Sequence, residues 1–432
     1  TKHREMKELI RNQPHNPEEC EDFSMGELQA AIKAMKAKGA AGGDQIPPTF
    51  LKNLGSKGLQ FLLDMFNESF KTAIIPQAWK SGVILPILKA GKPASKLESY
   101  RPISLTSVIV KALERMIHVR LYRMAEKKGW INKSQAGFRK GRSCEDQILR
   151  ITQNISDGFQ KKPMGRTVLL MLDYSKAYDK VWVQDLLIEM IKKGVPIMFI
   201  KWVRAFLQDR TAKVLYNGSL SKTVKMRQGL PQGAVLSPLL FLFFIDDLHK
   251  LVPEGVEIAM FADDASVWSE DPDLNKAAAR IQEVADKIEA WSQKKKMTIN
   301  VSKSEVAVFT NSTNEAKWRP KIKMLGNEVP FNPSPKFLGV HLDRSLSFQE
   351  HVTQTTKKAS TRLRILACLA SKSWGWSKLN LKTIFMATFR SVLDYAGAAW
   401  QPFLSSTQLK KTGRLPKQSS ETHNMTVLLN PR

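Results

Sequence analysis

The sequence predicts an α+β fold, and three stretches carry that prediction. Residues 167–172 form a continuous apolar run of strand length, as expected for a strand buried on both faces. Residues 257–268 are apolar on both sides of an Asp-Asp pair, which indicates a hairpin with acids at its tip. Residues 274–294 show clear helical periodicity. Because no internal repeat or low-complexity linker separates such segments, we expect interleaved domains.

The N-terminal third is expected to be mainly helical. Residues 23–38 have apolar side chains at helical spacing, and Ser24 with Glu27 three residues later forms a capping box. Gly39 ends this helix, and an extended segment containing two prolines follows at residues 75–88. Further helices are expected at residues 50–70, 108–124, 181–193 and 236–248.

The C-terminal part adds two strands and a helical region. Residues 297–310 and 336–342 read as strands, and the chain reads as helical from His351 to about Tyr395. The tail from Leu404 is polar and lacks periodicity, so we expect it to be incomplete or out of frame. The chain begins without methionine, and we therefore expect a fragment of something longer.

The composition is that of an ordinary globular protein. The 432 residues are 43% hydrophobic and 25% charged, which excludes bulk disorder, collagen and a disulfide mini-scaffold. Three widely spaced cysteines exclude a disulfide framework and a cysteine-rich zinc site, and they indicate a reducing compartment. The longest apolar run, residues 239–245, is far shorter than the ~20 residues of a membrane helix. We therefore expect no membrane partner and no secretion.

The net charge of +27 is concentrated in two blocks. Residues 71–150 carry +12 and residues 351–432 carry +11, and residues 151–350 between them carry only +5. Segregated positive charge is typical of a protein that binds a polyanion. A solvated basic surface is the alternative. A role at a membrane surface is disfavoured because the sequence has no compact basic amphipathic helix.

Three aspartates are the candidate chemical centre. Asp173 ends the apolar strand, where a carboxylate is costly unless it meets a cation or solvent, and Asp263 and Asp264 occupy the hairpin tip. Bringing them together is unfavourable unless divalent cations lie between the like charges. Two Mg²⁺ ions held by carboxylates and substrate phosphates assist an in-line phosphoryl displacement. The alternative is a helix cap at Asp173 and a pair of turn acids, with no metal.

Seven strings, taken together, resemble the motifs of a reverse transcriptase. Motifs A, B and C are resembled by LDYSKAYDKVW at residues 172–182, QGLPQG at 228–233 and FADD at 261–264. Two fingers blocks are resembled by YRPISL at 100–105 and QAGFR at 135–139. KFLGV at 336–340 resembles the primer-grip hairpin, and SVLDY at 391–395 with Trp400 resembles the thumb of Jockey-like non-LTR retrotransposons. One departure is Gln45, which stands where the family usually has glycine.

The resemblance implies a right-hand polymerase fold, with fingers, a palm built on an antiparallel sheet, and a helical thumb. It implies an N-terminal helical extension at residues 1–70, fingers at 71–150, and a palm with inserted fingers elements at 151–335. The primer-grip hairpin and helical thumb would occupy residues 336–432. The implied activity is RNA-directed DNA polymerisation that copies retrotransposon RNA by nucleotidyl transfer from dNTPs to a primer 3′-hydroxyl.

The resemblance also implies cofactors and partners. Two Mg²⁺ ions, with Mn²⁺ as an alternative, would be held by Asp173, Asp263 and Asp264. The partners would be an RNA template, a DNA primer and dNTPs, with the element RNA bound as a ribonucleoprotein in the nucleus and cytoplasm.

Five residues are implied to contact the incoming nucleotide besides the acids. Tyr178 would lie under the sugar and exclude a 2′-hydroxyl, unless it is only a core aromatic. Gln232 and Gly233 would lie beside the nucleotide and template. Arg101, together with Lys89, would contact the triphosphate.

Two further features are implied to act on the leaving group and the primer. Lys303 would protonate pyrophosphate, unless it is simply a solvated lysine. Phe337, Leu338 and Gly339 would hold the primer end, unless they form a plain core strand. The reverse transcriptase of a mobile intron is the alternative within the polymerases, and a non-catalytic nucleic-acid-binding relic is the alternative from another class.

Overall fold

The computed structural model describes residue 8, residues 21–370 and residues 375–413, with only the backbone described from residue 410 on. The chain forms two units. The first combines Thr1–Phe138, Tyr174–Lys250 and Ala290–Thr298, and the second combines Arg139–Asp173, Leu251–Glu289 and Ile299–Arg432. Each unit is therefore assembled from three separate stretches, as interleaved domains require.

Within residues 21–72, the described part of the first unit is mainly helical. Helix α2 (Met25–Lys33) starts with the predicted capping box, because Ser24 and Glu27 exchange side chain–backbone hydrogen bonds. The single helix expected at residues 50–70 is instead two helices, α3 (Pro48–Lys52) and α4 (Ser56–Thr72). The break has a local cause, since Gly55 is extended and serves as the N-cap of α4.

A five-stranded sheet is the main β-structure of this unit. Its order is β2 (Tyr100–Leu105), β1 (Ser81–Leu88), β4 (Arg210–Tyr216) and β5 (Ser219–Leu220), and β6 (Val224–Met226) also pairs with β4. Strand β1 is antiparallel to β2 and parallel to β4. Thus only the second half of the extended segment expected at residues 75–88 is a strand, after the short 3₁₀ helix η2 (Gln77–Lys80).

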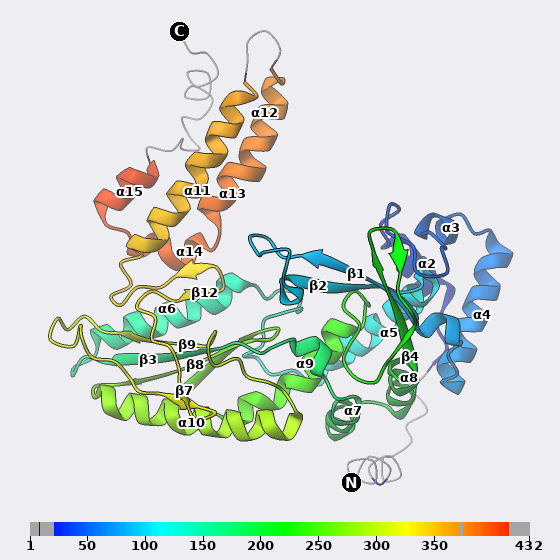
Figure 1. Ribbon diagram of the computed structural model, residues 1–432, viewed down its shortest axis with the longest axis horizontal. Coiled ribbons are helices and arrows are strands. Elements are labelled where there is room, and N and C mark those ends of the chain that lie inside the picture. The colour runs from blue at the N-terminus through cyan, green and yellow to red at the C-terminus, as the bar shows by residue number, and fades with distance from the viewer. Residues whose placement is uncertain (1–7, 9–20, 371–374, 414–432) are drawn as a thin grey trace. The chain divides into compact units, whose positions relative to one another are not determined.

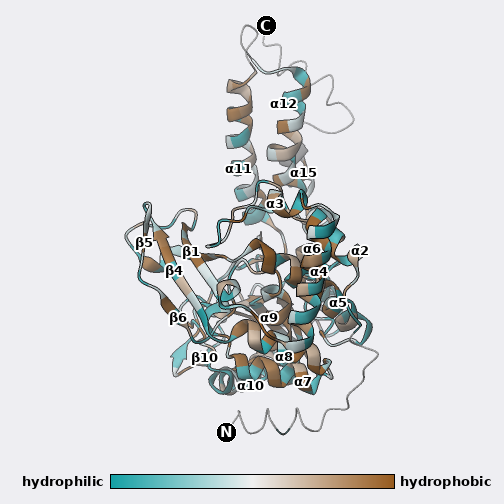
Figure 2. Ribbon diagram, turned by 90° about the vertical axis from the view of Figure 1, so that its right-hand side faces the viewer, coloured by the Kyte–Doolittle hydropathy of each residue, from teal (hydrophilic) through white to brown (hydrophobic). Residues whose placement is uncertain are grey.

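The first unit also contains the helices α5 (Val108–Lys127), α7 (Val183–Lys192), α8 (Ile197–Leu207) and α9 (Ser237–Ile245). Helix α9 is apolar on every side and is hydrophobic along its ribbon in Figure 2. A helix of this kind must be buried on all sides, and seven consecutive residues from Leu239 to Ile245 are. Three short 3₁₀ helices are η3 (Leu97–Ser99), η4 (Ala177–Lys180) and η5 (Asp246–Leu251).

The second unit is built on an antiparallel sheet with the order β7 (Val256–Phe261), β8 (Asp264–Asp271), β3 (Arg166–Leu172) and β9 (Glu305–Phe309). The predicted strand at residues 167–172 and the predicted hairpin at 257–268 are confirmed. Helix α6 (Cys144–Gln160) covers one face and α10 (Leu274–Lys295) lies along the other (Figure 1). The strand expected at residues 297–310 is limited to β9, because residues 301–303 form a turn.

Hairpins and helices follow the sheet in the second unit. The hairpins are β10 (Lys323–Met324) with β11 (Asn327–Glu328) and β12 (Lys336–Phe337) with β13 (Val340–His341). The region predicted to be helical contains α11 (Gln349–Cys368), α12 (Lys378–Ile384), the π-helical η6 (Phe385–Arg390) and α13 (Ser391–Asp394). Beyond it lie α14 (Gly397–Trp400), η7 (Gln401–Phe403) and α15 (Ser406–Gly413).

The predicted aperiodic tail therefore begins with a helix, and its remainder, residues 414–432, lies outside the described residues. The helices α11 to α13 share a small apolar core of their own, centred on Phe385 and Phe389. None of the described helices combines the length and the apolar character needed to span a membrane.

Candidate active site

The sheet of the second unit brings the three predicted acids to one edge. Strand β3 pairs with β8 so that Leu172 faces Ala265, and the next position on each strand is Asp173 and Asp264. Asp263 lies in the two-residue turn that joins β7 to β8. Because directly opposed residues of antiparallel strands project to the same face, this register sets Asp173 beside Asp264.

The turn that carries Asp263 is backbone-strained. Its first central residue, Ala262, has φ 57°, a left-handed conformation that favours glycine. Ala262 is nevertheless buried, and Phe261 and Asp264 pair on either side of it. Such strain persists only where the surrounding structure imposes it, and it is concentrated at functional sites.

Asp173 is fixed by a neighbouring loop through its main chain. Its N–H donates to Ser304 Oγ at 3.2 Å, and its carbonyl accepts from the N–H of Asn300 at 2.8 Å. Ser304 Oγ in turn donates to the Asn300 carbonyl at 3.0 Å. This loop therefore fixes the main chain of Asp173 at the end of β3.

The electrostatics of this edge favour a cation. Burial, and then the charges of Asp263 and Asp173, raise the pKa of Asp264 to about 6. Across the described part of the chain, no three His, Cys, Asp or Glu side chains already lie close enough together to hold a metal ion. Mg²⁺ is usually held by one or two carboxylates and completed by water and substrate phosphates. The acids present fit that kind of incomplete protein ligand set.

Lys303 lies in the same loop that fixes Asp173. It belongs to the turn between Asn300 and Ser304, its N–H donates to the Asn300 carbonyl at 3.1 Å, and its side chain is exposed. The structure thus gives Lys303 a connection to the Asp173 backbone, and an exposed side chain in the manner of an ordinary solvated lysine.

The predicted primer-grip residues divide into a core pair, Phe337 and Val340, and a turn in which Leu338 is half-buried and Gly339 is exposed. Phe337 and Val340 are 4% and 0% exposed and belong to the apolar core shared with α6 and α14. Between them, Leu338 has φ 43° and Gly339 has φ 98°, as a two-residue hairpin turn requires. The Phe337 side chain is therefore a core residue, and only the turn itself is available to a ligand.

The motif B loop lies in the first unit and is bound closely to its neighbours. Gly229 has φ 81°, and a Cβ there would lie 2.6 Å from the Asp179 carbonyl oxygen. Gly233 has φ 113°, and a Cβ there would lie 2.8 Å from the Ser104 carbonyl oxygen. Glycine is required at both positions, because any side chain would meet backbone atoms in a disfavoured conformation.

Gln232 and Tyr178, two predicted nucleotide contacts, are each held by neighbouring residues of the first unit. Gln232 Nε2 donates to Asp179 Oδ1 at 3.0 Å, and its carbonyl accepts from the N–H of Ser104 at 2.6 Å. Tyr178 lies in η4, and its ring stacks on Phe241 with centroids 4.6 Å apart. One face of the Tyr178 ring is therefore packed, as for a core aromatic, but the residue as a whole is only half-buried.

Sequence reasoning missed Arg210, which anchors the same loop. Its guanidinium donates to the carbonyls of Gln228 at 3.0 Å and of Gly229, and burial lowers its pKa to about 10. Arg210 also lines a cavity of about 290 Å³ together with Lys80, Lys176 and Gln232. The available signal was a charged residue that directly follows the polar residues Gln208 and Asp209, where the apolar helix ends.

The two predicted triphosphate contacts lie elsewhere in the first unit. Arg101 is exposed on β2, opposite Ile87 of β1. The ammonium group of Lys89 donates to the Glu98 carbonyl at 2.9 Å, within the β1–β2 connection. Neither residue lines the cavity next to Arg210, because its β2 wall is made by the alternate positions Pro102 and Ser104.

Comparison with known proteins identifies the family of this chain. A family model described as reverse transcriptase (RNA-dependent DNA polymerase) matches residues 87–342, more than half of the chain. The chain belongs to the reverse transcriptase family. Membership gives the right-hand polymerase fold predicted from the sequence, and it places the chain in a family of nucleotidyltransferase enzymes.

Two individual relatives are similar to most of this chain. The chain is 33% identical to the probable RNA-directed DNA polymerase from transposon BS of Drosophila melanogaster, over 87% of this chain and 42% of that protein. It is 30% identical to the RNA-directed DNA polymerase from mobile element jockey of the same fly, over 80% of this chain and 38% of that one. The chain thus spans about two fifths of the length of these relatives.

One solved structure is also similar. Apo telomerase from Candida tropicalis, truncated from its C-terminal domain, aligns with a TM-score of 0.43 and 13% identity, covering 65% of this chain and 59% of that one. Similarity at this level carries no conclusion about function.

Proposed function

We propose that this reverse transcriptase chain is the RNA-directed DNA polymerase of a jockey-like non-LTR retrotransposon. The observation that supports it most is the strand register that sets Asp173 beside the Asp263–Asp264 turn at one edge of the sheet. The relatives named as polymerases of a transposon and of a mobile element support the same assignment.

The proposed reaction is nucleotidyl transfer. The primer 3′-hydroxyl attacks the α-phosphate of a dNTP, a new phosphodiester bond forms, and the bond to the β-phosphate breaks with release of pyrophosphate. Asp173 and Asp263, with Asp264 as a third acid, would hold two Mg²⁺ ions, or Mn²⁺ in their place. When bound, these ions stabilise the charge on the attacking and leaving oxygens.

The roles proposed for the other residues are those that the resemblance implies. Gln232, held between Asp179 and Ser104, would present its loop to the nucleotide and template. Tyr178, supported from behind by Phe241, would block a 2′-hydroxyl. Arg101 and Lys89 would contact the triphosphate, with Lys89 first having to leave the Glu98 carbonyl. Lys303 would donate a proton to pyrophosphate.

The proposed partners are an RNA template, a DNA primer and dNTPs, in a ribonucleoprotein with the element RNA in the nucleus and cytoplasm. The proposed organisation keeps the N-terminal extension at residues 1–70, fingers at 71–150, palm at 151–335 and thumb at 336–432. The basic excess within residues 71–150 and 351–432 supports contact with nucleic acid in the fingers and thumb.

A primer-extension assay tests the proposal. The full chain is given a DNA primer on an RNA template with dNTPs, with Mg²⁺ or with a chelator. Extension that requires the cation and is lost in Asp173→Asn supports the proposal. Template–primer binding without extension under every cation condition would contradict it and would favour a binding relic.

A further inference from the structure

Tyr395 touches the β12–β13 turn directly. Its hydroxyl donates to the Leu338 carbonyl at 2.7 Å. Its ring lies against Gly339, because a Cβ built at that position would come within 3.0 Å of Tyr395 Cε1. One side chain from the end of α13 thus covers both residues of the turn.

Tyr395 is itself fixed by the apolar core. The indole N–H of Trp400 donates to the Tyr395 carbonyl at 3.0 Å, and Trp400 is 1% exposed. The following residue, Ala396, is left-handed with φ 51°, and Glu145 of α6 accepts from the N–H of Ala398 at 3.1 Å. The phenol ring is therefore presented to the turn by a rigid support.

The turn needs such a contact. Leu338 is left-handed with φ 43°, a conformation that costs an ordinary residue about 1–2 kcal/mol. The strands on either side contribute only two residues each, so few ladder hydrogen bonds hold the turn. Burial, then the neighbouring Cys144 and Glu145, raise the pKa of Tyr395 to about 12. Its hydroxyl consequently stays protonated and able to donate near neutral pH.

We propose that Tyr395 is a positioning residue that fixes the Leu338–Gly339 turn for contact with the 3′ end of the primer. The inference rests on the proposed function, since it takes this turn as the primer-binding element. It adds a residue to which no role was assigned, and it gives a second reason, beside the φ of 98°, why a side chain at position 339 is unfavourable. It also connects α13 to the primer, through the ring of Tyr395.

The first test removes one atom. Tyr395→Phe keeps the ring and loses the hydroxyl, and Tyr122→Phe on α5 is the matched control. Dissociation constants are measured without dNTPs, for an RNA template with a recessed DNA primer and for the template alone. Loss of the hydrogen bond to Leu338 in Tyr395→Phe should weaken the affinity for the primed template about three- to tenfold. We expect no change for the template alone and none in the control.

The second test measures whether the contact between the Tyr395 ring and Gly339 affects the affinity for primed template. Gly339→Ala is combined with Tyr395→Ala in a double-mutant cycle on the same affinity. Gly339→Ala should cost less affinity when the ring is absent, because part of its cost is the collision with Tyr395. A purely structural Tyr395 would lower the melting temperature and weaken both ligands equally, and that result would overturn the inference, as would unchanged affinities.

The binding readout separates this inference from the proposed function. A wild-type chain that binds primed template but never extends it contradicts the polymerase, while the Tyr395 comparison still decides the positioning role. A wild-type chain that binds primed template no better than template alone contradicts the inference itself.

Discussion

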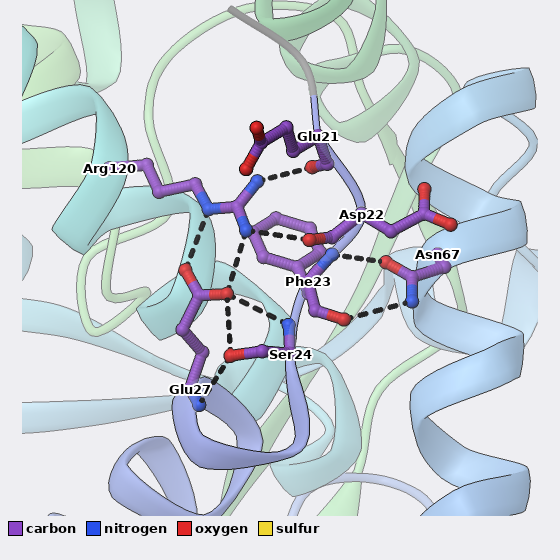
Figure 3. A network of polar contacts seen from close by, with 7 residues as sticks. All are labelled: Glu21, Asp22, Phe23, Ser24, Glu27, Asn67 and Arg120. Atoms are coloured by element: carbon purple, nitrogen blue, oxygen red, sulfur yellow. Dashed lines mark hydrogen bonds and ion pairs between the residues drawn. The ribbon is translucent and has the colours of Figure 1, made fainter.

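Arg120 and Glu27, 93 residues apart, form a two-point ion pair: Nε lies 2.6 Å from Oε1, and Nη2 lies 2.7 Å from Oε2 (Figure 3). The same guanidinium donates to the carbonyls of Glu21 and Asp22 and lies 4.2 Å above the ring of Phe23. A single arginine of α5 thereby fastens the capping box of α2 and the segment before it.

We expect this pair to matter for stability. Arg120→Met keeps the aliphatic stem and leaves a half-buried Glu27 and two carbonyls without their donor. The expected loss is about 1–2 kcal/mol of unfolding free energy, measured by urea denaturation. Lys71→Met, which removes an exposed bridge to Asp22, is the control and should cost less than about 1 kcal/mol. Equal losses in the two variants would contradict the special role of Arg120.

Glu114 is expected to make stability depend on pH. It is 0% exposed on α5 and accepts from the N–H of Leu236 at 3.0 Å, and burial raises its pKa to about 7. Between about pH 4.5 and 7 the folded chain keeps this proton and the unfolded chain releases it, so stability falls as pH rises. Glu114→Gln should remove this slope. The unfolding free energy of the variant, taken relative to that of the wild type, should be higher at pH 8 than at pH 5 by on the order of 2 kcal/mol.

The control for that experiment is Glu98→Gln, which changes an exposed carboxyl. Urea unfolding of the three proteins near pH 5 and pH 8 measures the slope. A wild type and Glu114→Gln variant with parallel pH profiles would show that Glu114 is ionised in the folded chain at neutral pH.

Arg210 is expected to act on nucleotide binding through the motif B loop. Arg210→Met leaves the carbonyls of Gln228 and Gly229 without their donor, and the loop that carries Gln232 should shift. We expect the KM for dNTP to rise about tenfold while the KM for primed template stays unchanged. Lys213→Met, an exposed cation on the same strand, is the control. A rise in both KM values together would indicate general unfolding instead.

Tyr178 is expected to control sugar selection. Tyr178→Ala removes the ring that stacks on Phe241 and opens space beneath C2′ of the nucleotide. The ratio of kcat/KM for dNTP over NTP should fall at least about tenfold. Tyr178→Phe keeps the ring and should retain the ratio. An unchanged ratio in the alanine variant would make Tyr178 a packing residue only.

Local chemistry explains which parts of the fold were predictable. The capping box of Ser24 and Glu27 is a four-residue pattern, and it was predicted and confirmed. Its partner Arg120 is 93 residues away, and no local pattern points to it. Helix α6 was not predicted, although Ser143 and Asp146 form the same kind of box and the buried residues Ile148, Ile151 and Ile155 recur at helical spacing.

In the candidate active site, too, local patterns were predictable and long-range packing was not. The strand end and the acid pair identified Asp173, Asp263 and Asp264 as candidates, and the hairpin pattern accounts for the turn that holds Asp263. The register that sets Asp173 beside Asp264 joins strands that are distant in the sequence, and no local pattern specifies it. Burial was harder to predict: the same pattern suits a ligand contact and a core residue, and Phe337 is in the core. Gln45, which stands where the family usually has glycine, is left-handed with φ 57°, a conformation that favours glycine.

The acids at this sheet edge are proposed to support nucleotidyl transfer, and Asp263→Asn tests this most directly. The substitution keeps the shape of the turn and removes one carboxylate charge. RNA-templated extension with saturating Mg²⁺ should fall by about a hundredfold or more, while the affinity for primed template stays near the wild-type value. The control Asp286→Asn on the exposed side of α10 should extend normally. Full extension by Asp263→Asn would contradict the account.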